Sequence, residues 1–164
     1  MTIHIWPYNW GWIGKENMRE NLSSAIANSK EYIDEHLAIA SRHRKPVVME
    51  EFGFPRDGLA CDRTTSTSGR DTYYEAIFSY IHDNMCNGGL FAGCNFWAWG
   101  GFAALSDDPS KWRRGDDYTG DPAQEPQGLN SVFSSDTTTI ELIRKYSGLL
   151  SGRQAETAAP STEQ

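Results

Sequence analysis

VVMEEFG, at residues 47–53, is the most informative stretch of this sequence. It opens with three apolar residues directly after a proline, and it closes on a glycine. A continuous apolar run with such boundaries is typical of a strand that is buried on both faces, as in a parallel sheet. Two adjacent carboxylates, Glu50 and Glu51, follow the apolar residues. The stretch therefore predicts a buried strand that delivers a carboxylate to the edge of a parallel sheet.

The segments on either side of this strand alternate between strand and helix patterns. Short apolar stretches at residues 2–6 and 90–99 predict two further strands. Apolar residues at steps of three and four predict helices at 17–43, about 70–86 and 136–150. This order predicts parallel βα units, which carry their chemistry at the carboxyl ends of the strands.

The chain divides into one expected domain and a tail. Residues 1–150 hold all the predicted strands and helices and are expected to form one α/β domain. Within it, the connection 102–135 is long and rich in Asp, Gly and Pro, and loops of that length are usually functional or disordered. Residues 151–164 are polar and rich in Ala, Ser, Thr and Glu, so we expect a disordered tail there.

The net charge and the aromatic content of the chain limit the classes of molecule that it is expected to bind. The chain has 164 residues and a formal net charge of −7, without clusters of Lys and Arg. That balance argues against nucleic acid and against anionic membranes as partners. Aromatic residues make up 12% of the chain and include six tryptophans. Exposed tryptophan favours a ligand with apolar faces, such as a carbohydrate, although core packing would account for about half of the six.

The cysteines and the N-terminus do not show the patterns of a disulfide framework, a metal site or a signal peptide. Cys61, Cys86 and Cys94 show neither a paired disulfide framework nor a metal-binding spacing, and one bridge among them stays open. We expect no metal and no cofactor. The sequence contains no transmembrane stretch, and MTIHIWPYNWGW at its start lacks the pattern of a signal peptide. We expect the chain to begin in mid-domain.

The adjacent carboxylates are the first candidates for chemistry. Neighbouring residues of a regular strand point to opposite sides, so only one of Glu50 and Glu51 is expected to face the interior of the fold. A buried carboxylate needs partners, because removing an ion from water is costly. The strand pattern alone does not decide between the two, nor between catalysis and ordinary structural hydrogen bonds.

Histidine and tryptophan supply the other candidates. His4 at a strand end could hold a hydroxyl or a carboxylate, although a lone histidine there is more often structural. Two tryptophans two residues apart on a regular strand face the same way, so one of them could form the floor under a sugar ring. Loop tryptophans could extend a groove along several sugar units. The tryptophans concerned are Trp6, Trp97 and Trp99 at strand ends, and Trp10, Trp12 and Trp112 in loops.

Four stretches together resemble glycoside hydrolase family 5, and most of all its endo-β-1,4-mannanases. HIWPYNWGW at 4–12 resembles the sixth barrel strand and the following loop, and VVMEEFGFPRDG at 47–58 resembles the seventh. GCNFWAWGGF at 93–102 resembles the eighth strand, and GLNSVFSSDTTTIELIRKY at 128–146 resembles the last helix and its approach. The likeness covers about residues 2–148. It implies the C-terminal part of a TIM (β/α)8 barrel, about strands six to eight with their helices.

The resemblance assigns roles to individual residues. Glu51, before Phe-Gly, is similar to the family's catalytic nucleophile, and His4 matches the histidine of the sixth strand. Trp6 stands where most members have a tyrosine that hydrogen-bonds the nucleophile, so its indole N–H would have to substitute. Trp97 matches the tryptophan under the sugar that is attacked, with Trp99 as the second choice. The loop tryptophans Trp10 and Trp12 are expected to contact the substrate as well.

The resemblance also shows what the chain lacks. In the family, the acid/base glutamate follows an Asn at the end of the fourth strand, and no Asn-Glu pair ends a strand here. Retaining hydrolysis needs two carboxyl groups about 5–5.5 Å apart. General acid catalysis typically contributes about 10²–10⁴-fold. We therefore expect this chain alone to be nearly inactive and to need the missing N-terminal half of the barrel.

These expectations combine into one function with stated alternatives. The resemblance implies a mannan endo-1,4-β-mannosidase that acts with retention of configuration on β-mannan or a related plant polysaccharide. The full-length parent would be secreted, periplasmic or at the cell surface. A β-1,4-glucanase of the same family is the first alternative, and a catalytically inert fragment that binds sugar weakly is the second. With two bare sheet edges, the chain alone is also expected to be poorly soluble or to self-associate.

Overall fold

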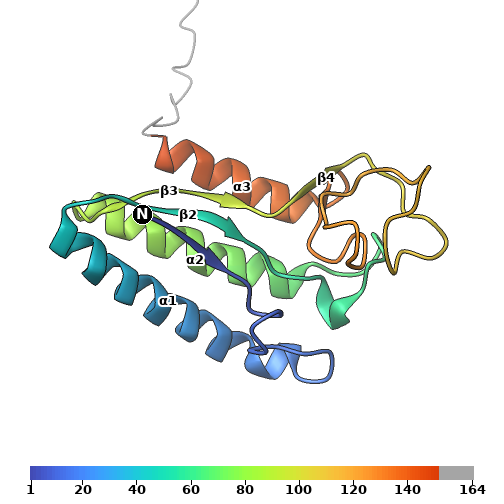
Figure 1. Ribbon diagram of the computed structural model, residues 1–164, viewed down its shortest axis with the longest axis horizontal. Coiled ribbons are helices and arrows are strands. Elements are labelled where there is room, and N and C mark those ends of the chain that lie inside the picture. The colour runs from blue at the N-terminus through green and yellow to red at the C-terminus, as the bar shows by residue number, and fades with distance from the viewer. Residues whose placement is uncertain (152–164) are drawn as a thin grey trace, which may run out of the picture.

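The computed structural model describes residues 1–151 as a parallel three-stranded sheet that three helices accompany (Figure 1). The strand order is β1-β2-β3, and both pairings are parallel. The predicted α/β class is thus confirmed, while the tail predicted at 151–164 lies, apart from Ser151, outside the described residues. In order, the elements are β1 Thr2–Ile5, α1 Met18–His43, β2 Val47–Phe52, the short helix η1 Asp57–Leu59, α2 Ser68–Cys86, β3 Phe91–Phe96, β4 Trp99–Gly101, β5 Val132–Phe133 and α3 Thr137–Leu150.

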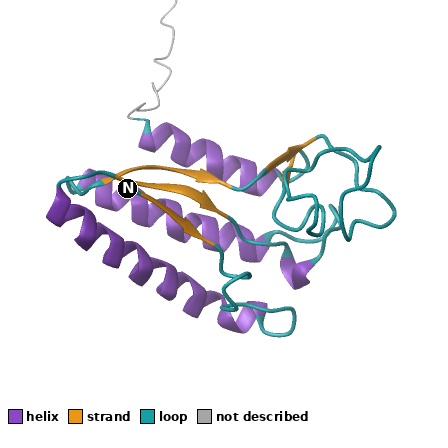
Figure 2. Cartoon of the chain, in the orientation of Figure 1, coloured by secondary structure: helices purple, strands orange, loops and turns teal. Residues whose placement is uncertain are grey.

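The helices form where the apolar spacing predicts them. α1 buries Ala25, Ile33 and Ala40, which recur at the steps of a single helical face. The helix ends because Arg44 takes the left-handed conformation (φ 51°), and its N–H bonds back to helix carbonyls. Figure 2 shows the three helices running beside the sheet, while the irregular segments gather at one end of the molecule. No helix within residues 1–151 is long and apolar enough to cross a membrane.

The core lies between the sheet and the helices. Phe52 at the end of β2 is fully buried, and its ring centroid lies 5.0 Å from that of Tyr74 and 5.4 Å from that of Phe78, both on α2. Such aromatic contacts add to the free energy gained by removing the rings from water. Val47 and Met49 of β2 are fully buried as well. The apolar residues of this strand therefore fix it against α2.

β2 contains one residue more than its neighbours near its carboxyl end. Ile3 pairs with Met49 and Ile5 pairs with Phe52, so β2 uses one more residue than β1 over this stretch. β3 shows the same difference, because Cys94 pairs with Met49 and Phe96 pairs with Phe52. An extra residue of this kind is a β-bulge, and it shifts the alternation of faces by one. Strict alternation of faces along β2 is therefore interrupted at Glu50, which has no partner in either pairing.

The third strand is shorter than predicted. It ends at Phe96 and not at Trp99, and the chain then leaves the sheet. Trp99 begins β4, which pairs in parallel with β5 in a separate two-stranded sheet. The regular strand that would have aligned Trp97 with Trp99 is therefore absent in the described structure. Trp97 is half-buried, whereas Trp99 is 54% exposed.

Two buried arginines fasten the long loops to α2 and α3. Arg70 of α2 is fully buried and donates hydrogen bonds to the carbonyl oxygens of Phe54, Ser131 and Leu129. Arg56 is also buried and pairs with Asp136 at 2.5 Å between nitrogen and oxygen. Charges without water need such partners, since an unpaired buried ion is very costly. The network holds the chain after β2 and the chain before α3 in fixed positions.

Candidate active site

A cavity lies where the strands of the sheet end. It has a volume of about 280 Å³, and its walls combine one carboxylate, two tryptophans and polar loop residues. Figure 1 shows that β1, β2 and β3 run in the same direction and that the long loops collect beyond their carboxyl ends. In parallel α/β folds this is the end at which catalytic groups are placed. The lining residues are Trp6, Asn9, Glu51, Trp97, Pro122, Glu125 and Asn130.

The bulge in β2 decides which carboxylate faces the cavity. Under strict alternation, Glu51 would share the face of Met49, which is buried in the core. The additional residue turns Glu51 to the other face, where it lines the cavity with its side chain 29% exposed. Glu50 is 54% exposed and does not line the cavity. The geometry therefore separates two carboxylates that the strand pattern leaves equivalent.

His4 lies between both carboxylates. Its Nδ1 is 3.3 Å from a carboxylate oxygen of Glu51, and its Nε2 is 3.4 Å from one of Glu50. A neutral imidazole donates a proton from only one of its nitrogens, so it can satisfy one of these carboxylates, whereas an imidazolium satisfies both. His4 is paired with Glu51 in register across β1 and β2. The ring therefore contacts both carboxylates, and its hydrogen bond, through Nε2, joins it to Glu50. A role of His4 in orienting Glu51 stays a prediction.

The two tryptophans of the cavity meet above a glycine. The ring centroids of Trp6 and Trp97 lie 6.3 Å apart with planes at 74°, an edge-to-face arrangement. A Cβ atom on Gly53 would lie 2.6 Å from the Trp6 ring and 2.9 Å from the carbonyl oxygen of Trp97. Any side chain at this position would displace one of them. The glycine that follows Glu51-Phe52 is therefore required by the packing of the site itself.

The indole N–H of Trp97 is buried and finds no acceptor among the described residues. A buried donor without a partner costs about 1–3 kcal/mol. Trp6 also lines the cavity, but no hydrogen bond from its indole to Glu51 occurs in the described part of the chain. The predicted role of Trp6, a hydrogen bond to the nucleophile in place of the family's tyrosine, therefore has no supporting contact among the described residues.

Three other predicted sugar-contacting residues lie outside the cavity. Trp10 packs against Trp12 at 5.0 Å between centroids and against Tyr32 of α1 at 5.2 Å. These contacts direct the loop after β1 toward the helix and not toward Glu51. Trp99 lies in a groove between β3 and α3 that Phe78 and Ile143 also line. The structure therefore brings together His4, Trp6, Glu51 and Trp97, and it leaves the other tryptophans apart.

Four cavity residues were not among the candidates from the sequence. Asn9 lies in the loop after β1, and Pro122, Glu125 and Asn130 come from the long connection before β5. Asn9 and Asn130 lie within stretches that resemble the family, at 4–12 and 128–146, but neither was assigned a role there, and Pro122 and Glu125 belong to no such stretch. Their place depends on contacts between distant segments, such as those of the buried arginines. Glu125 is notable because it adds a second carboxylate to the cavity wall.

The cysteines do not contribute nucleophiles to the site. All three are free thiols, so the disulfide that the sequence left open is not formed. Burial raises the pKa of Cys94 to about 12 and also raises the pKa of Cys61. Since the thiolate is the reactive form, these two side chains are inert near neutral pH. Within residues 1–151, no group of three or more His, Cys, Asp or Glu side chains could hold a metal ion.

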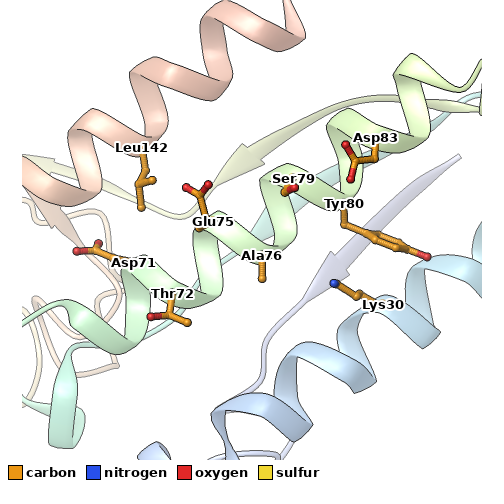
Figure 3. Close-up of a pocket in the computed structure, with 9 residues that line it drawn as sticks. All are labelled: Lys30, Asp71, Thr72, Glu75, Ala76, Ser79, Tyr80, Asp83 and Leu142. Carbon is orange, nitrogen blue, oxygen red and sulfur yellow. The ribbon is translucent and has the colours of Figure 1, made fainter.

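A larger groove on the helices has a structural explanation. It measures about 560 Å³ and lies over α2, between α1 and α3 (Figure 3). Its polar side chains already have partners. Asp71 accepts a hydrogen bond from Thr138 at 2.6 Å, Glu75 pairs with Lys145 at 2.8 Å, and Tyr80 donates to Asp34. These contacts join the helices to one another, so the groove is part of the helix packing.

Comparison with solved structures identifies similar folds. The chain is similar to the crystal structure of a glycoside hydrolase family 5 mannosidase from Rhizomucor miehei, with 33% identity and a TM-score of 0.82 over 93% of this chain and 37% of that one. A glutamate-to-alanine mutant of that enzyme, in complex with mannosyl-fructose, gives 32% identity and a TM-score of 0.81 over 93% and 38%. The chain therefore spans little more than a third of the length of these relatives.

A second kind of relative is more distant. The endo-1,4-β-D-mannanase from Thermotoga petrophila RKU-1 is 26% identical, with a TM-score of 0.53 over 90% of this chain and 33% of that one. A search of curated proteins gave no significant match. The family model described as GH family 5 beta-mannosidase-like matches residues 1–154, which is nearly the whole chain. This chain therefore belongs to the β-mannosidase-like group of glycoside hydrolase family 5.

Proposed function

We propose that the whole protein hydrolyses internal β-1,4-mannosidic bonds of mannan-type polysaccharides with retention of configuration, and that Glu51 is its nucleophile. The observation that supports this proposal is that only one of the two adjacent carboxylates lines the cavity. Glu51 lines the cavity beside Trp6 and Trp97, while Glu50 stays outside it. A carboxylate at the strand end of a barrel glycosidase, within a cavity of aromatic walls, is suited to attack a sugar.

The proposed reaction has two steps. In the first, the Glu51 carboxylate forms a bond to the anomeric carbon, and the bond from that carbon to the leaving oxygen breaks as the acid protonates the oxygen. In the second, water attacks the same carbon, its proton passes to the residue that served as acid, and Glu51 is released. We place the acid/base residue in the part of the parent barrel that this chain does not include. The isolated chain is then expected to be nearly inactive.

The described residues give each supporting group a task. His4, whose Nδ1 lies 3.3 Å from a carboxylate oxygen of Glu51, can hold that side chain in position. Trp97 can support the apolar face of the sugar. Trp6 completes the wall through its edge-to-face contact with Trp97. No step in this scheme needs a metal or a redox cofactor.

A β-mannosidase that acts on short saccharides is the second candidate. One observation favours it. The relative with a TM-score of 0.82 is a mannosidase, and a mutant of that enzyme has been captured with mannosyl-fructose, whereas the endo-mannanase reaches 0.53. Both candidates break β-mannosidic bonds and both use Glu51 in the same role.

The test compares two neighbouring carboxylates in the whole protein. Glu51→Gln is expected to lower kcat/KM on β-mannan by roughly 10³-fold or more, because losing a nucleophile removes the covalent step. Glu50→Gln, the matched control, is expected to stay within about tenfold of the parent, because it can act only through His4. A larger loss of kcat/KM in Glu50→Gln than in Glu51→Gln would show that the wrong carboxylate of β2 has been assigned to the cavity.

The substrates in the same assay separate the candidates. Faster release of reducing ends from β-mannan than from mannobiose supports internal cleavage, and the reverse supports the β-mannosidase. Equal or faster hydrolysis of carboxymethylcellulose would make the protein a β-1,4-glucanase and overturn the mannan proposal. Retention is checked by ¹H NMR of the first anomer released. Secretion of the whole protein and β-mannan of plant origin as its natural substrate stay predictions.

A further inference from the structure

One wall of the Glu51 cavity is a loop without helix or strand. Pro122, Glu125 and Asn130 line the cavity, and all three belong to the connection between β4 and β5. An irregular segment has many conformations, and holding it in one of them costs conformational entropy. Where contacts within the chain do not meet that cost, binding has to order the loop and affinity falls. The contacts that fix residues 122–130 therefore bear on how tightly the cavity holds a ligand.

A buried carboxylate joins the two ends of this loop. Asp121 directly precedes the loop and is 8% exposed. Its Oδ1 accepts a hydrogen bond from the backbone N–H of Asn130 at 3.0 Å, and its Oδ2 accepts one from that of Gly128 at 2.8 Å. The hydroxyl of Ser131 donates to Oδ2 at 2.5 Å. Hydrogen bonds to a charged acceptor are stronger than those between neutral groups. Asp121 therefore closes the loop at its base.

A buried glutamine holds the interior of the loop. Gln127 is 4% exposed, and its Nε2 donates to the carbonyl oxygens of Pro122 at 2.8 Å and Glu125 at 2.9 Å. Its Oε1 accepts a hydrogen bond from the hydroxyl of Thr119 at 3.0 Å. Because carbonyl oxygens only accept, the amide group fits these partners in one orientation. One side chain thus fixes the backbone at two positions that line the cavity.

The base of the loop rests on the segment that carries Trp97. Gly120 has φ 97°, and a Cβ atom on it would lie 2.8 Å from the Cβ of Ala98. Only glycine combines this backbone conformation with so close an approach. On the far side of the loop, the N–H of Val132 donates to the carbonyl oxygen of Ala98 at 2.8 Å. All these contacts join residues of this chain, so the wall is held without other parts of the parent barrel.

We propose that Asp121 and Gln127 are positioning residues that hold residues 122–130 as a preformed wall of the Glu51 cavity. Neither residue lines the cavity, so each acts through the residues that it holds. This proposal rests on the proposed function and deepens it, because a preformed wall lets a β-mannoside bind without first ordering the loop. The ordering cost falls on the bound substrate and the transition state alike, so loss of these contacts is expected to raise KM and to leave kcat nearly unchanged.

The experiment makes two measurements on the whole protein. Hydrogen–deuterium exchange followed by mass spectrometry reports how often the backbone of residues 122–130 opens in the absence of substrate. Steady-state kinetics give kcat and KM on β-mannan or mannobiose, whichever the parent hydrolyses faster. Gln127→Met preserves the length of the side chain and removes its hydrogen bonds. It is expected to speed exchange of the loop by roughly tenfold and to raise KM by roughly 3–10-fold, with kcat within about twofold of the parent.

Matched variants separate positioning from general loss of stability. Thr119→Val removes the hydroxyl that orients the Gln127 amide and should change exchange and KM in the same direction, but less. Thr119→Ser keeps a hydroxyl and should restore both. Ser29→Ala removes a buried hydroxyl that lies 2.7 Å from the Tyr73 hydroxyl between α1 and α2. It should lower the melting temperature and leave KM and the exchange of the loop unchanged.

The results decide the proposal in either direction. It is overturned if Gln127→Met exchanges and binds substrate as the parent does, if it loses kcat at an unchanged KM, or if Ser29→Ala raises KM equally. A rise in KM that occurs in Thr119→Val and disappears in Thr119→Ser supports it, and this pair replaces Gln127→Met if that variant does not fold. Failure of the proposed function would look different, because the parent would then hydrolyse no β-mannoside. The exchange measurement needs no substrate and would still show whether Gln127 holds the loop.

Discussion

Arg70 shows how single residues determine the position of the site. It is fully buried, and its guanidinium satisfies three backbone carbonyls that come from the segments flanking the cavity. Burial lowers the pKa of Arg70 because the charged form loses water, yet nearby carboxylates such as Asp136 favour that form. Residue-scale contacts of this kind fix loops that have no secondary structure of their own.

Replacing Arg70 is predicted to destabilise the whole domain. Arg70→Met should lower the free energy of unfolding by about 3–5 kcal/mol, because three buried carbonyls lose their donor. Arg114→Met removes the same charge from an exposed position and should change stability by no more than about 0.5 kcal/mol. Urea unfolding followed by circular dichroism measures both. Equal stability of the two variants would mean that water replaces the guanidinium.

The residue scale also shows where sequence reasoning ends. The apolar run before Glu50 and Glu51 predicts the strand, but the strand pattern cannot say which carboxylate faces the cavity. The answer lies in the pairing of β2 with β1 and β3, since the extra residue is defined only against its partners. Glu125 and Asn130 could not be predicted for the same reason. Their place depends on contacts between segments that are distant in the chain.

At the scale of elements, the local spacing of apolar residues predicts the positions of the helices. The predicted helices at 17–43 and about 70–86 agree with α1 and α2 to within a few residues, because helix formation depends on neighbours three and four apart. The strand predicted at 90–99 was too long. Its aromatic pattern continues past Phe96, but Trp99 pairs with Val132, and a pairing over such a distance leaves no local trace.

The packing of α2 on α3 gives a prediction that depends on pH. Glu75 of α2 accepts hydrogen bonds from Lys145 and from Tyr146 of α3, each at 2.8 Å. The bond from Lys145 is the main reason why the pKa of Glu75 is below its ordinary value. A carboxyl group whose pKa is lower in the folded chain than in the unfolded chain stabilises the fold at pH values above its unfolded pKa. This contribution disappears as the pH falls through its pKa in the folded chain.

Glu75→Gln is therefore expected to matter only above the acid range. At pH 7 it should lower the free energy of unfolding by up to about 1 kcal/mol, because the pair is exposed and screened by solvent. At about pH 3, closer to complete protonation of Glu75, the variant and the parent should become more similar. Glu141→Gln on the exposed surface of α3 makes the same charge change as a control. A constant difference between pH 3 and pH 7 would contradict the role of the ionised pair.

At the scale of the whole molecule, the sheet has two open edges. Within residues 1–151, β1 and β3 each pair only with β2, so the outer side of each strand has unpaired N–H and C=O groups. A groove of about 530 Å³ with an apolar lining that includes Phe96 runs beside the free edge of β3. Open edges of this kind promote association between chains. The parallel order and the α/β class were predictable from the alternation of elements, whereas this consequence depends on how much of the barrel is present.

The chain alone is predicted to self-associate through these edges. Sedimentation velocity should show a mass that rises with protein concentration. Ala92→Lys places a charge on the exposed part of β3 and should reduce association, because a charged edge resists pairing. Ala38→Lys makes the identical change on the exposed surface of α1 and should have little effect. A monomer at every concentration with a sharp, reversible melting transition would contradict this expectation.

The additional residue in β2 also has a consequence for insertions and deletions. Without Glu50, the remaining residues would alternate regularly, with Met49 in the core, Glu51 toward the cavity and Phe52 in the core again. Deleting Glu50 therefore leaves the Glu51 side chain directed toward the cavity. A deletion one or two residues earlier would instead move the strand residues before the deletion to the opposite side of the sheet. In descendants of this sequence, a gap aligned to Glu50 is compatible with an intact site, while Glu51 and Gly53 stay fixed on either side of Phe52.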